Sequence, residues 1–109
     1  MPDNIYTAQE LEYLKKSAEN GNADAQYEIG YYYEYIDATE KNMTKAFEFY
    51  KKSAENGISQ AQLALGCCYK FGKGTEKNLI ESVHWYLKTY DNGDTFAENA
   101  LKELIKNNQ

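Results

Sequence analysis

Two cysteines and one histidine are the residues of this 109-residue chain that most readily bind metals or act as nucleophile and base. Cys67 and Cys68 are adjacent, and neighbouring side chains on a helix point about 100° apart, so the two sulfurs cannot easily share a metal ion. A disulfide between them would strain the backbone, and the chain has no further cysteine. We therefore expect both to pack as small side chains, and we expect no metal or other cofactor.

Catalysis by the other polar residues has equally little support. His84 has no evident nucleophile or orienting carboxylate, so it is a poor general base and is expected on a helix surface. The 17 acidic residues could supply a carboxylate pair almost anywhere, so no pair is informative. Gly72-Lys73-Gly74 lacks the remaining glycine and the Lys-Ser/Thr ending of a phosphate-binding loop, so we expect a turn there. The sequence predicts a protein that is not an enzyme.

Recognition by aromatic side chains is better supported, because 11 residues are tyrosines. Residues four apart share a helix face, and this spacing defines two stripes: a tyrosine stripe (Tyr27, Tyr31 and Tyr35) and, 36 residues later, a second stripe (Leu63, Cys67 and Phe71). Tyrosine is a frequent anchor at protein interfaces, so both stripes are predicted to contact a protein partner. The alternative is that each stripe packs against a neighbouring helix, and both interpretations stay open.

A repeat must position these side chains. Lys-Lys-Ser-Ala-Glu-Asn-Gly occurs at 15–21 and again at 51–57, and a degraded copy, Leu-Lys-Thr-Tyr-Asp-Asn-Gly, follows at 87–93. The terminal glycines of the copies are 36 residues apart. A period of this length indicates supersecondary units that stack because no unit covers its own apolar face.

Six helices are expected, at about 7–20, 22–36, 43–56, 59–71, 79–92 and 95–106. Thr7 and Glu10 have the spacing of a capping box, and Asn22 and Asn78 are further candidate N-caps. The glycine that ends each heptapeptide copy is expected to end a helix in the left-handed conformation.

Gly30 and Gly66 lie inside predicted helices, at the same position of the repeat. A glycine in a helix interior costs about 1 kcal/mol relative to alanine. In the expected helix at 22–36, Ala25, Ile29 and Tyr33 share one face with Gly30, and this face is expected to be the core side. The two glycines are therefore predicted to allow close approach between helices.

The pattern within each period resembles the Sel1-like repeat family, a group of tetratricopeptide-related α/α repeats. That family has A-Q-x-x-L-G-x-x-Y-x-x-G-x-G, a turn, and then K-A-x-x-W-Y-x-K-A-A-x-x-G. The second unit here carries Ala61-Gln62, Leu65-Gly66, Tyr69, Gly72, Gly74, Trp85-Tyr86, Lys88 and Gly93, and the first carries Ala25-Gln26, Ile29-Gly30, Tyr33, Lys45-Ala46, Phe49-Tyr50, Lys52, Ala54 and Gly57. The resemblance spans nearly the whole chain. It implies an all-α fold, an α/α solenoid in which antiparallel helix pairs form a right-handed superhelix, acting as a protein-binding scaffold without catalysis.

The chain departs from the family pattern at several positions. Ile36 and Ala38 stand where Gly-x-Gly belongs, so the first turn is expected to differ from the second. Glu81-Ser82 replaces Lys-Ala. Some members pair cysteines within each repeat, which the adjacent cysteines here do not match. A hydrolase acting on cell-wall or β-lactam substrates, by analogy with those members, is therefore only a third hypothesis.

We expect a single domain over 1–109, composed of a half-repeat at 7–21, repeats at 22–57 and 58–93, and a capping helix at 94–109. In stacked helix pairs the first helices line the concave surface, so the two stripes would lie there. The final helix has Asn99, Glu103 and Asn107 at the stripe positions and Lys102 at the glycine position. A polar last repeat is typical of a solubilising cap.

The net charge of −5 disfavours nucleic acid and anionic membranes as partners and mildly favours a basic protein. Glutamates on the predicted helix surfaces interleave with lysines and are expected to be solvated; they are Glu10, Glu12, Glu19, Glu28 and Glu34. An adaptor for one protein partner is the leading functional hypothesis. The alternative is an immunity-type inhibitor that neutralises a basic toxin or enzyme, and homo-oligomerisation also stays open.

Residues 1–14 have neither the basic segment nor the apolar run of a secretory signal, and no stretch approaches the length of a membrane span. The cysteine pair offers no disulfide framework. We expect a reducing, cytoplasmic location.

Overall fold

The computed structural model describes residues 6–91 and 95–107, and these form six α-helices and one π-helical turn, with no strand. The elements in chain order are α1 (Ala8–Glu19), α2 (Ala23–Tyr31), η1 (Tyr32–Ile36), α3 (Glu40–Glu55), α4 (Ser59–Phe71), α5 (Leu79–Asp91) and α6 (Thr95–Asn107). The all-α fold class and the number of helices predicted from the sequence are confirmed.

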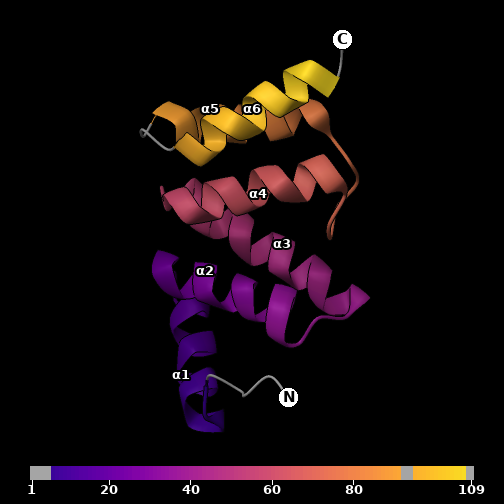
Figure 1. Ribbon diagram of the computed structural model, residues 1–109. Coiled ribbons are helices and arrows are strands. Elements are labelled where there is room, and N and C mark those ends of the chain that lie inside the picture. The colour runs from indigo at the N-terminus through magenta and orange to yellow at the C-terminus, as the bar shows by residue number, and fades with distance from the viewer. Residues whose placement is uncertain (1–5, 92–94, 108–109) are drawn as a thin grey trace.

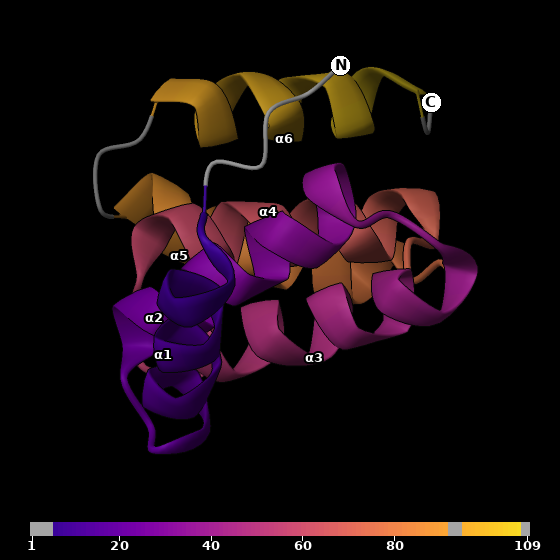
Figure 2. The same cartoon turned by 90° about the horizontal axis from the view of Figure 1, so that it is seen from below.

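The helices stack in chain order, and each contacts mainly the helix before it and the helix after it. Figure 1 shows this stack, with α1 at one end and α6 at the other, and Figure 2 views it from the α1 end. The molecule is elongated, with principal extents of 48 × 26 × 23 Å. This arrangement is an α/α solenoid, in which each helix pair covers the apolar face of the next.

Most predicted helix ends are confirmed. The Thr7 hydroxyl accepts from the Glu10 N–H, and the Glu10 carboxylate accepts from the Thr7 N–H, which completes a capping box. Asn22 caps α2 through a 2.9 Å bond from the Ala25 N–H. Gly21 and Gly57 have φ of +98° and +90°, as a left-handed helix end requires. Gly93, for which the same role was predicted, lies outside the described residues.

The start of α3 was predicted wrongly. The helix begins at Glu40, three residues before the expected position 43, because the Thr39 hydroxyl accepts from the Asn42 N–H at 3.1 Å and so caps an earlier turn. The chain reaches Thr39 through η1, whose π-type bond joins the Asp37 N–H to the Tyr32 carbonyl at 2.9 Å. The first turn therefore differs from the second, as the missing Gly-x-Gly predicted.

Close approach at the two helix glycines is confirmed. A Cβ added to Gly30 would lie 2.7 Å from ring atoms of Tyr50, and one added to Gly66 would lie 2.6 Å from those of Tyr86. Both rings are almost completely buried, so they have little freedom to move away. The rings of α3 and α5 thus lie directly on the backbones of α2 and α4.

A repeated hydrogen bond explains the Ala-Gln pair of the sequence pattern. The Gln26 amide donates to the Ala18 carbonyl at 3.1 Å, and the Gln62 amide, 36 residues later, donates to the Ala54 carbonyl at 3.2 Å. Each bond joins the first helix of a pair to the last turn of the preceding helix. These buried bonds fix the spacing between successive units of the stack.

Candidate functional site

The six residues of the two stripes line a single cavity of about 240 Å³ between α2 with η1 and α4. We call this cavity the stripe groove. Its lining residues come from the two stripes, from η1 and α3, and from the turn after α4: Tyr27, Tyr31, Glu34, Tyr35, Tyr50, Gln60, Leu63, Ala64, Cys67, Phe71 and Lys73. The structure thus brings together all the residues that the sequence indicated for partner binding, and their binding role stays a prediction.

The stripes are exposed at one end of the groove and packed at the other. The exposed fractions are 41% for Tyr31, 60% for Tyr35 and 61% for Phe71, whereas the stripe residues nearer the helix starts are half-buried. The Tyr31 and Tyr35 rings lie 4.7 Å apart, centroid to centroid, and so support each other. Large aromatic area is therefore available to another molecule at the C-terminal ends of α2 and α4.

The prediction that Glu34 is solvated was wrong. Its side chain is only 8% exposed, and both carboxylate oxygens are engaged. The Tyr50 hydroxyl donates to Oε1 at 2.7 Å, and the Lys73 ammonium donates to Oε2 at 3.1 Å. Glu34 follows Gly30 by four residues, so it lies beside the place where the Tyr50 ring crosses the backbone. That spacing is the sequence signal that would have shown its burial.

Lys73 is a groove residue that the sequence assigned only to a turn. The turn itself is confirmed, because Gly72 and Gly74 have φ of +70° and +69°. A Cβ on Gly74 would collide with the Met43 carbonyl at the start of α3, so the turn packs closely on the preceding repeat. This contact brings the Lys73 side chain to Glu34, across 39 residues of sequence.

The Glu34 carboxylate raises the pKa values of both groups that donate to it, Lys73 and Tyr50. Burial alone would lower the pKa of Lys73, but the hydrogen bond and the charge of Glu34 outweigh it and raise that pKa. The pKa of Tyr50 is raised above its usual value by burial and then by its bond to Glu34 and the carboxylate charge. Both groups therefore stay protonated at neutral pH.

Cys68 is buried and Cys67 is half-buried, whereas the one histidine is exposed. Both thiols are free; Cys67 lies 3.0 Å from the Tyr86 hydroxyl, and burial raises the pKa of Cys68 to about 12. His84 is exposed and touches the Trp85 ring edge-on. Among the described residues, no three His, Cys, Asp or Glu side chains could hold a metal ion together.

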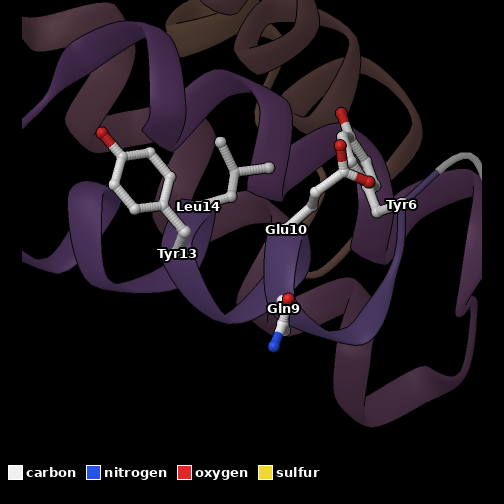
Figure 3. A pocket seen from close by; sticks show the side chains of 5 residues that line it. All are labelled: Tyr6, Gln9, Glu10, Tyr13 and Leu14. Atoms are coloured by element: carbon white, nitrogen blue, oxygen red, sulfur yellow. The ribbon is translucent and has the colours of Figure 1, made fainter.

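A second hollow, of about 380 Å³, lies on α1 at the end of the stack. Figure 3 shows Tyr13 and Leu14 on one side of it and Tyr6 and Glu10 on the other. Leu14 is the repeat counterpart of Tyr50, the residue with which α3 packs on α2. The hollow on α1 therefore lies on the face that corresponds to the face of α3 packed on α2.

The final helix presents polar residues where the earlier first helices present the stripes. Asn99, Glu103 and Asn107 are exposed, and Lys102, at the glycine position, pairs with Glu98 at 2.9 Å.

No helix in the described part of the chain is both long enough and apolar enough to cross a membrane.

The stacked pairs, the repeated Gly–Tyr contacts and the repeated Ala-Gln bonds define a helical-repeat protein. The Sel1 repeat model matches residues 11–22, 23–58 and 59–94. The chain therefore belongs to the Sel1 repeat family, whose fold generally mediates protein–protein interaction.

Solved structures agree with this assignment. A Sel1 repeat protein from Oxalobacter formigenes is 31% identical, with a TM-score of 0.84 over 89% of this chain and 28% of that one. The protein c5321, a protective antigen present in uropathogenic Escherichia coli strains, is 32% identical, with a TM-score of 0.83 over 91% of this chain and 21% of that one. Cysteine-rich protein B of Helicobacter pylori is 26% identical, with a TM-score of 0.78, over 88% and 72% of the two chains.

This chain thus spans 28% and 21% of the length of the first two proteins. No curated protein sequence matches it significantly.

Proposed function

We propose that the chain is a non-enzymatic adaptor that binds one protein partner through the stripe groove. The observation that carries the proposal is the gathering of both stripes around one cavity, with Tyr31, Tyr35 and Phe71 exposed at its rim. Exposed aromatic rings on a rigid helical surface provide large contact area at a low cost in side-chain entropy. The stack of helices holds the two sides of the groove at a fixed distance.

Capture of the partner from a lysate of the source cells tests this function. Tyr31→Asp places a charge among the groove rings and should abolish capture of the partner that the wild-type chain retains. Tyr13→Asp is the matched control, because Tyr13 is 75% exposed on α1, outside the groove. Equal capture by wild type and Tyr31→Asp, both folded by circular dichroism, would contradict the proposal.

An immunity-type inhibitor of a basic toxin or enzyme is a second candidate function. The net charge of −5 favours a basic partner. Salt separates the two functions, since steering between opposite charges is screened at high ionic strength. A strong loss of affinity with salt supports the inhibitor, and a weak dependence on salt supports the adaptor.

The proposal places the protein in the cytoplasm, with neither nucleic acid nor a membrane as partner. The negative net charge supports the exclusion of these two partners, since nucleic acids and anionic membranes repel an acidic protein. Adjacent free thiols at Cys67 and Cys68 suit a reducing compartment.

A further inference from the structure

The Glu34 carboxylate in the groove wall pairs with a lysine from a distant turn. Glu34 is buried, and a buried carboxylate requires a cation or several hydrogen-bond donors. The cation is Lys73, whose side chain is 38% exposed, whereas that of Glu34 is 8% exposed. Lys73 comes from a turn between two glycines of positive φ and not from a helix face. The buried member of the ion pair is therefore the Glu34 carboxylate, and the accessible member is the Lys73 ammonium.

Two aromatic side chains lie at the same end of the groove. The Lys73 ammonium lies 5.7 Å from the centre of the Phe71 ring, and Tyr35 also lines the groove at this end. A cation over an aromatic face is attracted to it, more strongly when water is excluded. A buried carboxylate beside exposed rings is an arrangement that binds a cationic side chain.

We propose that Glu34 and the rings of Tyr35 and Phe71 form a binding seat for an arginine side chain of the protein partner, and that Lys73 occupies this seat in the free protein. The inference rests on the proposed function for the source of the arginine. Binding then consists of an exchange, in which the partner's guanidinium replaces the ammonium of Lys73 and Lys73 turns into solvent.

Arginine fits the seat better than a second lysine does. Its guanidinium is planar, so it can stack on a ring while donating two hydrogen bonds to one carboxylate, and it is less strongly hydrated than an ammonium. Each oxygen of Glu34 accepts one bond in the structure, and a carboxylate oxygen has about two acceptor positions. The Tyr50 bond can therefore stay in place when the guanidinium binds.

The competing interpretation is a fixed clasp, in which Lys73 only ties the second repeat to the first. A clasp predicts that loss of the lysine lowers stability and creates no site. A seat predicts that loss of the lysine frees a site, because the apparent affinity of a ligand rises with the fraction of protein able to accept it.

The test uses N-acetyl-arginine amide as the probe and the neutral N-acetyl-citrulline amide as its control. Binding is measured by calorimetry and by the rise in melting temperature, for wild type and for Lys73→Ala. Lys73→Ala should bind the arginine probe at least about ten-fold more tightly than wild type, because the internal competitor is gone. The citrulline probe should give no response. Lys73→Gln keeps only a neutral and weaker donor for Glu34, and it should give a smaller gain in the same direction if Lys73→Ala folds poorly.

Lys70→Ala is the matched control. Lys70 also lies over Phe71, at 5.0 Å, but its ion pair is with Glu103, so its removal changes the net charge equally and leaves Glu34 paired. An equal gain in Lys70→Ala, or an undiminished gain in Lys73→Ala with Glu34→Gln, would overturn the seat. So would arginine binding no tighter to Lys73→Ala and Lys73→Gln than to wild type.

The two proposals fail separately. If Tyr31→Asp abolishes partner capture while neither Lys73 variant gains arginine affinity, the adaptor function stands and the seat is overturned. If the Lys73 variants gain affinity for the arginine probe while Tyr31→Asp leaves capture intact, the seat stands as a site for the guanidinium and the groove is not the partner surface.

Discussion

A buried carboxylate must recover through contacts in the fold what it loses by leaving water. Glu34 does so with one hydroxyl and one ammonium, from two different elements of the chain. The Tyr50 ring also packs on Gly30. One tyrosine therefore joins α3 to α2 through its ring and to η1 through its hydroxyl.

Replacement of Tyr50 by phenylalanine tests this double role. The ring contact stays, but the bond to Glu34 is lost, and a hydrogen bond to a charged group contributes about 1.5–3 kcal/mol. The free energy of unfolding from urea titration should fall by that amount. Tyr13→Phe, which changes an exposed hydroxyl, should leave it unchanged. An equal effect of the two substitutions would contradict the assigned role of the Tyr50 hydroxyl.

The pH dependence of stability follows from the same contacts. Burial and Glu34 raise the pKa of Tyr50 above its usual 10.0, and Glu34, against burial, raises that of Lys73 above 10.5. A group with a higher pKa in the folded state contributes its full stability below the unfolded pKa and loses it as the pH rises above that value. Stability should therefore decline above about pH 10.

Tyr50→Phe removes one of these titrating groups, so its stability should decline less steeply above that pH than that of wild type. Urea unfolding at several alkaline pH values measures both slopes. Parallel slopes would show that Tyr50 does not contribute.

At the scale of elements, the repeat made most of the stack predictable from sequence. Glycines 36 residues apart located the helix ends, and Gly30 and Gly66 located the ring contacts. The Thr39 cap was missed because threonine is also common in turns. The spacing from Gly30 indicates that Glu34 is buried, but it does not indicate the pairing of Glu34 with Lys73, a distant turn residue. Pairings of this kind arise from the tertiary arrangement, which local patterns do not contain.

The position of Gly66 gives a prediction at this scale. Gly66→Leu would force a side chain into the Tyr86 ring, and overpacking of this kind costs about 1–3 kcal/mol. Thermal and urea unfolding should both show the loss. The control is Lys102→Leu, which places leucine at the same repeat position of α6, where the side chain is exposed. An unchanged melting temperature for Gly66→Leu would contradict close approach at this position.

At the scale of the whole molecule, α1 and α6 each pack principally on one helix, whereas α3 and α4 are held from both sides. In such a stack the end units open at lower free energy than the middle ones. Amide hydrogen exchange should therefore be faster in α1 and α6 than in α3 and α4. Equal protection of α6 and α4 within one sample would show that the stack opens only as a unit.

The neighbour-to-neighbour packing visible in Figure 1 also has a kinetic consequence. Helices that meet their partners across a short connection lose little loop-closure entropy before the first contact forms. The chain accordingly has a low contact order, which places its refolding time on the scale of helical bundles, on the order of microseconds to milliseconds. Nascent chains could then complete one helix pair before the next is synthesised.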